Sequence, residues 1–192
     1  DINPCFVFHP MNAYEEDNKI ILHVCRQDKA MVGGMDQIYG GDETTGKLWK
    51  WTIDLDTLSC KEEQIDDKPC DFARVDDRRT GLKANIGYAM ELNNKAETLT
   101  FGNNLFKYNL DKGNREDHFL GDYTVGGEPL FAPNPNVNDE KDGYVMSIVH
   151  DNEKNQSKLL IIDSDNFSDK AVAEILLPQR VPFGAHGSWL EN

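Results

Sequence analysis

The strongest constraint on the fold is the way apolar residues are grouped along the chain. They form runs of about 4 to 8 residues, separated by polar clusters such as EEDNK, DEKDG and DNEKNQ. A helical period of apolar residues is hard to find. Short runs divided by Asn, Asp, Gly and Lys are typical of antiparallel strands joined by turns. The pattern therefore predicts an all-β protein, and no long linker or low-complexity block divides it.

The strands are expected at Cys5–Phe8, Ile20–Cys25, Leu48–Asp54, Lys61–Ile65, Ile86–Glu91, Thr98–Phe101, Leu105–Asp111, Pro129–Ala132, Tyr144–His150, Lys158–Asp163 and Val172–Leu177. The first strand leads into His9 and a turn that contains Pro10. Several acidic residues between strands are expected to be solvated turn residues, namely Glu15, Glu16, Asp139, Glu140 and Asp142.

A short motif recurs in three of the predicted strands. An aromatic or aliphatic residue, a spacer, Ile or Leu and then Asp occur as WTID, YNLD and LIID. The final residues, Asp54, Asp111 and Asp163, are separated by 57 and 52 residues. This spacing is close to the length of the larger propeller blades, each of which is a four-stranded antiparallel sheet. The repeat predicts a β-propeller in which each copy lies in the outer half of one blade.

The other half of the repeat carries one polar residue in each unit. His9, Asp71, Glu128 and His186 follow one another at separations of 62, 57 and 58 residues. Because the innermost strands of a propeller converge on its axis, these four side chains are expected to point into one small space. Imidazoles bind metal ions, and carboxylates accept the other ring N–H, which fixes the tautomer. The alternative is four separate hydrogen-bonding residues at strand ends.

Three further histidines are not expected to bind a metal ion. His23 lies within a predicted strand, ILHVC, and should be a core or sheet-face residue. His118 stands among charged residues in REDHF and is expected to be solvated. His150 ends the strand SIVHD, one strand away from the phase of His9.

The charge of the chain restricts its partners. With 34 acidic and 20 basic residues the net charge is −14, and such a surface repels phosphate backbones, so nucleic acid is excluded as a partner. Anionic membrane surfaces are disfavoured for the same reason, although a local apolar patch could provide a peripheral membrane contact. The longest apolar runs, such as LLII, are too short to span a bilayer.

Cysteine spacing gives a second restriction. Cys5, Cys25, Cys60 and Cys70 form no CxxC pair, so neither a zinc knuckle nor a redox dithiol is indicated. Cys5 and Cys25 lie in apolar runs and are expected to be buried. This usage favours a reducing, cytoplasmic location, with association to a membrane left open.

Seven segments, in this order, resemble the carotenoid cleavage oxygenase family: FHPMNAYEE, WKWTIDL, CDFARVDDRRTG with GYA at Gly87–Ala89, GEPLFAPNP, DGYVMSIVHD, LLIID and LPQRVPFGAHGSW. The family includes the retinal-pigment-epithelium isomerase, apocarotenoid oxygenases and lignostilbene dioxygenases. The resemblance runs over nearly the whole chain and covers the C-terminal part of such proteins. It implies residues 1–192 to be a C-terminal fragment of a single seven-bladed β-propeller domain, about three blades plus one strand, with the N-terminal blades absent.

The resemblance also implies a metal site. Family members hold a non-haem ferrous iron, Fe(II), on the propeller axis with four histidines, of which two match His9 and His186 and two belong to sequence upstream. Glu128 matches a family glutamate that supports a ligand histidine. Asp71 stands where the family has another glutamate, a departure that shortens the side chain by one methylene and puts its reach to a histidine in question.

The implied activity is oxidative cleavage, in which dioxygen adds across a conjugated carbon–carbon double bond of a carotenoid, apocarotenoid or stilbene to give two carbonyl products. The expected partners are an apolar polyene or stilbene-like molecule, O2 and the missing N-terminal part of the propeller; this fragment alone is expected to be inactive. Two alternatives remain open: an isomerase or hydrolase-type member of the family, and a non-catalytic propeller binding module.

Overall fold

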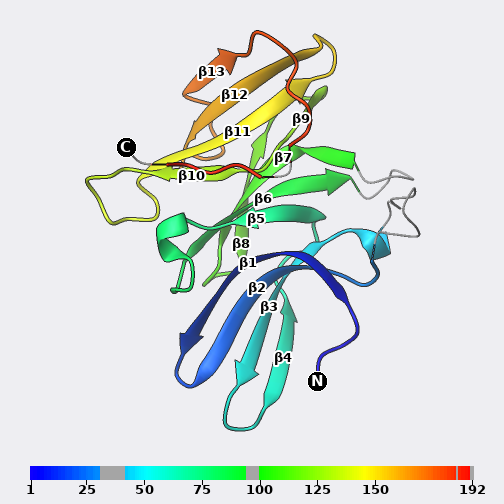
Figure 1. Ribbon diagram of the computed structural model, residues 1–192, viewed down its shortest axis with the longest axis vertical. Helices are drawn as coiled ribbons and strands as arrows, with labels where there is room; N and C mark the ends of the chain where they lie inside the picture. The colour runs from blue at the N-terminus through cyan, green and yellow to red at the C-terminus, as the bar shows by residue number, and fades with distance from the viewer. Residues whose placement is uncertain (31–41, 94–99, 185, 191–192) are drawn as a thin grey trace.

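Three antiparallel sheets make up the protein in a computed structural model that describes residues 1–30, 42–93, 100–184 and 186–190 (Figure 1). The first sheet contains β1 (Phe6–Glu16), β2 (Lys19–Gln27), β3 (Lys47–Asp54) and β4 (Ser59–Gln64). The second contains β5 (Cys70–Arg74), β6 (Ile86–Asn93), β7 (Thr100–Asn109) and β8 (Asn114–Phe119). The third contains β10 (Leu130–Pro133), β11 (Gly143–Asp151), β12 (Gln156–Asp163) and β13 (Ala173–Leu176), with the short β9 (Thr124–Val125) paired to β11.

The sheets repeat the same up-and-down order, which confirms the all-β prediction. Strands adjacent in sequence are adjacent in each four-strand path. The motifs WTID and LIID end β3 and β12, and YNLD begins at the end of β7 and continues into the turn after it; these are the third strands of the three sheets. The sheets are stacked in chain order, and the segment after β13 returns beside β10 (Figure 1).

Helical structure among the described residues is limited to two 3-10 turns, η1 (Asp42–Thr44) and η2 (Asp77–Arg79). In that part of the chain, no helix is long and apolar enough to cross a membrane.

The turn predicted at Pro10 is wrong, because β1 continues through it to Glu16. The pairing of β1 with β2 shifts register between Val7 and Pro10 and again between Pro10 and Asn12. A proline lacks the N–H of a ladder hydrogen bond, and bulges on an edge strand are where it can be placed. Glu15 and Glu16 are exposed as predicted, although they lie on a strand.

Other differences between the expected and the observed strands concern strand bounds that the sequence patterns did not give. None of the expected strand ranges covers β5, β8 or β9, although Asp71 of β5 was expected on an innermost strand and REDHF of β8 on an outer one. The segments expected at Thr98–Phe101 and Leu105–Asp111 belong, where described, to the single strand β7; Thr98 lies outside the described residues. Glycine and two asparagines suggested a break after Phe101. In the structure the Glu91 carboxylate accepts hydrogen bonds from the backbone N–H of Asn103 at 3.1 Å and from Nδ2 of Asn104 at 2.7 Å. These bonds keep the polar stretch in the strand.

Two apolar clusters form the core, one between the first and second sheets and one between the second and third. Cys25 and Cys70 belong to the first cluster, with Sγ atoms 3.9 Å apart. Tyr88 stacks on Phe131 in the second, with ring centroids 5.8 Å apart. Cys25 is buried as predicted, whereas Cys5 is only half-buried. The clusters fix the sheets relative to one another, and so fix the ends of β1, β5 and β10 where the candidate site lies.

Two predictions of solvated side chains are wrong. His118 is buried, since its Nδ1 lies 2.8 Å from the carbonyl oxygen of Phe167 in the loop after β12. Glu140 is also buried, and its carboxylate accepts hydrogen bonds from Asn85 and Ile86 of the neighbouring sheet. In both cases a segment distant in sequence covers a side chain whose local neighbours are polar. Asp139 and Asp142 are exposed as predicted.

His23 is a core residue, as predicted, with 2% of its surface exposed. Neither ring nitrogen has a hydrogen-bond partner among the described residues. Burial, with a smaller contribution from Lys50, lowers the pKa of His23 from 6.5 to about 4. Protonation of His23 therefore opposes the folded state.

We expect His23 to make the fold acid-sensitive. As pH falls from about 6.5 to about 4, the unfolded chain binds a proton that the folded chain does not, so the free energy of unfolding should decrease by about 3 kcal/mol. The His23→Leu variant lacks this group and serves as the control. Denaturant unfolding of both proteins across this window should show the free energy of unfolding of wild type falling relative to that of His23→Leu by about 3 kcal/mol; a difference between the two proteins that does not change with pH would contradict the buried, neutral state of His23.

Candidate metal centre

His9 lies at the start of the site, on β1, and contacts a carboxylate from the next sheet. Its Nδ1 lies 2.9 Å from Oδ1 of Asp71, on β5. The His9 side chain is 21% exposed and the Asp71 side chain 4%. The shorter side chain of aspartate thus reaches this histidine directly, without a bridging water. The hydrogen bond with Asp71 raises the pKa of His9 above its usual value.

A bulge in β5 places Asp71 and its neighbour. The pairing of β5 with β6 shifts register between Asp71 and Arg74, and Phe72 has a φ of 54°. The backbone N–H of Phe72 donates to Asp71 Oδ1 at 2.9 Å, so one carboxylate oxygen binds both this N–H and His9. The left-handed backbone is costly for a residue with a Cβ, and such strain occurs chiefly at functional sites.

His186 forms a second pair of the same kind. Its Nδ1 lies 3.0 Å from Oε1 of Glu128, a residue just before β10. The other oxygen, Oε2, accepts the backbone N–H of Gly187 at 2.7 Å. The Glu128 side chain is 6% exposed and the His186 side chain 55%. Glu128 therefore fixes both the ring and the backbone of the segment that carries His186.

The two pairs lie together. The ring centroids of His9 and His186 are 5.0 Å apart and the rings are nearly perpendicular, at 82°. With Nδ1 of each ring bonded to a carboxylate, the proton is held on Nδ1 and the lone pair on Nε2 is left for a metal ion. Metal–imidazole bonds are about 2 Å long, so two rings at this separation can bind one ion. The residues present fit a metal centre.

The structure thus brings all four sequence-predicted residues into one place. Among the described residues, however, no group of three or more His, Cys, Asp or Glu side chains could hold a metal ion. The described part of the chain supplies two candidate ligands, each with a carboxylate partner. His23, His118 and His150 bond or pack elsewhere; Nδ1 of His150 lies 3.1 Å from Oγ of Ser157.

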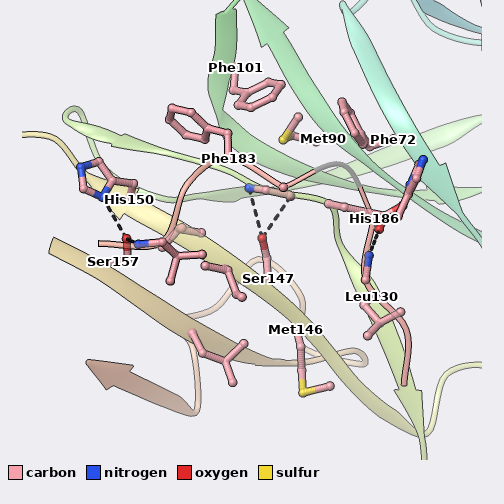
Figure 2. Close-up of a pocket in the computed structure, with 18 of the residues that line it drawn as sticks. Phe72, Met90, Phe101, Leu130, Met146, Ser147, His150, Ser157, Phe183 and His186 are labelled. Carbon is pink, nitrogen blue, oxygen red and sulfur yellow. Dashed lines mark hydrogen bonds and ion pairs between the residues drawn. The ribbon is translucent and has the colours of Figure 1, made fainter. Parts of the chain in front are cut away.

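An apolar pocket adjoins the centre, with a volume of about 370 Å³. Figure 2 shows Phe72, Met90 and Phe101 on one wall and Met146 and Ser147 on the opposite wall. The pocket also includes His186 and Glu128 among its lining residues. Ser147 bonds both the N–H and the carbonyl oxygen of Gly127, which leaves the wall mainly apolar.

Sequence reasoning missed Phe72 and Arg74. The Phe72 ring centroid lies 4.9 Å from that of His9 and 6.0 Å from that of His186. Arg74 contacts Glu128, with Nη1 3.3 Å from Oε1. Both flank Asp71 in CDFARVD, but without the bulge the alternation of a regular strand would assign them to the wrong faces.

The left-handed backbone at Phe72 leads to a prediction about stability. Phe72→Gly and Phe72→Ala remove the same aromatic ring, but only alanine keeps the cost of a positive φ. We expect the glycine variant to be more stable than the alanine variant by about 1 kcal/mol. At Ala73, the next position, Ala73→Gly should instead lower the free energy of unfolding. Denaturant unfolding measures each value, and a more stable Phe72→Ala would contradict the strained backbone.

Known proteins similar to this chain match it over nearly its whole length, including the residues of the candidate metal centre. The family model described as "Retinal pigment epithelial membrane protein" matches residues 1–191. The chain is 29% identical to a carotenoid cleavage oxygenase of Mycobacterium tuberculosis, over 98% of this chain and 38% of that protein. It is 26% identical to the lignostilbene-alpha,beta-dioxygenase isozyme III of Sphingomonas paucimobilis, over 97% of this chain and 41% of that protein.

Solved structures that resemble this chain belong to proteins of the same kind. The cobalt-substituted Synechocystis ACO matches with a TM-score of 0.87 and 26% identity, over 97% of this chain and 40% of that one. Such structures are seven-bladed β-propellers, which confirms the predicted fold class: the chain is the C-terminal part, about three blades, of such a propeller. The additional strand predicted around His186 is not formed in the described residues 177–184 and 186–190. The chain spans about two fifths of the length of the relatives that it matches.

Proposed function

Because this chain belongs to the retinal pigment epithelial membrane protein family, we propose that it is part of an Fe(II)-dependent dioxygenase that cleaves a conjugated carbon–carbon double bond. The observation that carries the proposal is the paired geometry of the centre. Two histidines 5.0 Å apart each bond a carboxylate through Nδ1. Relatives of this chain are oxygenases by name, including a lignostilbene dioxygenase.

In this proposal His9 and His186 hold the iron through Nε2. Asp71 and Glu128 orient the two rings, keep Nδ1 protonated and raise the basicity of Nε2. Iron held by these residues would supply the chemistry that activates dioxygen for addition across the double bond. Further ligands come from the N-terminal part of the propeller, outside this chain, and residues 1–192 act as one part of a single domain.

The adjoining pocket indicates the substrate class. Its walls carry aromatic and thioether side chains, among them Phe72, Phe101 and Met90, and it shares His186 with the metal centre. Flat apolar molecules pack well against such walls. We propose that the pocket holds part of a polyene or stilbene, with the double bond to be cleaved near His186. A cytoplasmic protein with peripheral membrane contact would have access to such substrates.

Labelled dioxygen tests the proposed reaction. The protein that includes the remaining blades would be incubated with carotenoids, apocarotenoids and stilbenes under ¹⁸O₂. The expected result is two carbonyl products that carry the label, as required when both oxygen atoms are inserted across one double bond. Turnover without label in any carbonyl would reject the dioxygenase and favour an isomerase or hydrolase. Absence of bound iron from the protein that includes the remaining blades would favour a binding module, whereas stoichiometric iron that is lost in His9→Ala and His186→Ala would reject that alternative.

Glu128→Gln should weaken the centre without abolishing it. The amide keeps the size of the side chain but loses the charge that holds the Nδ1 proton of His186, and losses at such supporting residues are about 10 to 100-fold in metal affinity or activity. Iron affinity and cleavage rate measure the effect. As a control, Glu153→Gln changes an exposed acid and should leave both values unchanged. Unchanged iron affinity and cleavage rate in Glu128→Gln would count against the role assigned to Glu128.

A further inference from the structure

One arginine lies between the two halves of the candidate metal centre. Arg74 ends β5, three residues after Asp71, and its side chain is 20% exposed. Its Nη1 donates to the carbonyl oxygen of Gly187 at 3.0 Å and lies 3.3 Å from Glu128 Oε1. Arg74 therefore contacts the carboxylate that holds His186 and also the residue that follows His186.

The guanidinium group is itself held in place. Its Nη2 donates to both carboxylate oxygens of Asp77, at 2.9 and 3.1 Å. Asp77 begins η2, in the connection that follows β5. A planar guanidinium can bind two carboxylates and a carbonyl oxygen at once in a fixed geometry, which an ammonium group cannot do. The orientation of Arg74 is thus set by β5 and η2 rather than by the segment that it contacts.

The segment that carries His186 depends on few anchors. Residues 181–184 and 186–190 have no strand pairing in the described structure. Their recorded hydrogen bonds occur at two places: Val181 N–H donates to Ser157 Oγ at 2.9 Å, and the second place is the cluster of Glu128 and Arg74 around His186 and Gly187. Among the hydrogen bonds of the described residues, those of this cluster therefore hold His186 and Gly187, and ring contacts of His186 with His9 and Phe72 add to them.

We propose that Arg74 is a positioning residue for the metal centre, which holds the His186 segment in place through Glu128 and Gly187. The consequence is that one short strand, β5, orients both candidate ligands: Asp71 contacts His9 directly, and Arg74 acts on His186 through its partners. The effect of Arg74 on metal affinity rests on the proposed function. Its effect on the position of the His186 segment does not, because that effect is expected in the protein without metal.

The test uses the protein with all its blades and compares three arginine variants. Arg74→Met keeps the length of the side chain but removes the guanidinium group, and Arg74→Lys keeps the charge without the planar donors. Arg79→Met is the matched control, because Arg79 lies in the same turn and its side chain contacts only Asn138 among the recorded hydrogen bonds of the described residues, at 3.4 Å. Asp77→Asn is a milder variant, because it weakens the ion pair that orients Arg74 but keeps the guanidinium group. It replaces Arg74→Met in the test if that variant fails to fold.

The first readout needs no metal. Hydrogen exchange in metal-free protein, measured on peptides that cover residues 186–190, should be about 10-fold faster in Arg74→Met than in wild type. Asp77→Asn should give a smaller increase, and Arg79→Met none. Equal exchange in Arg74→Met, Asp77→Asn and Arg79→Met would overturn the proposal.

The second readout is metal affinity. Titration with Co²⁺, followed by its visible absorption, should show a loss of about 10-fold in Arg74→Met, partly restored in Arg74→Lys. Because Arg74 acts through Glu128, its loss should be non-additive with Glu128→Gln in a double-mutant cycle. Full additivity would overturn the proposed route. If wild type itself failed to bind Co²⁺, the proposed function would fail, and hydrogen exchange would still decide the role of Arg74.

Discussion

His186→Ala is expected to remove bound iron and double-bond cleavage together. The variant deletes one Nε2 donor and leaves Glu128 with only the N–H of Gly187 and the guanidinium group of Arg74. Since the two imidazoles are the candidate ligands found among the described residues, iron content should fall from about one ion per protein to below about a tenth. His9→Ala should behave in the same way. Elemental analysis and product formation on the protein with all its blades measure both effects.

The matched control is another histidine beside the same pocket. His150 lines the apolar pocket, but its Nδ1 bonds Ser157 rather than a carboxylate. His150→Gln should therefore keep its iron, even if substrate binding changes. Iron retained at wild-type level in His186→Ala, or iron lost equally in His150→Gln, would contradict the assignment of ligands.

Glu140→Ala is expected to lower the free energy of unfolding by about 3 kcal/mol, because buried donors would lose a charged acceptor. Glu140 is 6% exposed, and its carboxylate accepts from the backbone N–H groups of Asn85 and Ile86 and from Asn85 Nδ2, the last at 2.6 Å. These bonds tie the loop between β10 and β11 to the start of β6, in the adjacent sheet. Their loss would loosen the contact between two sheets.

Two further variants refine this prediction. Glu140→Gln keeps one acceptor oxygen and should lose less stability than Glu140→Ala. Glu153→Ala removes an exposed acid and should change the free energy of unfolding by no more than about 0.5 kcal/mol. Denaturant unfolding compares them. A loss in Glu140→Ala no larger than in Glu153→Ala would show that the buried contact does not stabilise the fold.

Much of the fold was predictable because strand patterns are local. Apolar runs and polar turns give the strands, and the spacing of Asp54, Asp111 and Asp163 gives the repeat of four-stranded sheets. The same spacing places His9, Asp71, Glu128 and His186 together, since equivalent positions of successive blades face one axis. For these four residues the length of the repeat was enough to predict that their side chains lie close together.

The remaining features depend on contacts between sheets. Glu140 and His118 have polar neighbours in sequence, and their burial arises from β6 and from the loop at Phe167. Pro10 suggested a turn, but bulges in β1 accommodate it. The bulge in β5, which sets Phe72 and Arg74 against the centre, has no signal in the alternation of apolar and polar residues. Sequence patterns therefore indicated the candidate ligands and their carboxylate partners, but not Phe72 and Arg74, which contact the same centre.

The central claim is that His9 and His186 share one iron ion, each supported by its own carboxylate. Anomalous diffraction at the iron absorption edge, on crystals of the protein with all its blades, tests this most directly. The account predicts a single strong anomalous peak next to Nε2 of His9 and Nε2 of His186, with Asp71 and Glu128 on the opposite Nδ1 atoms. A peak bound elsewhere, or an iron-loaded protein with both Nε2 atoms hydrogen-bonded to other groups, would contradict it.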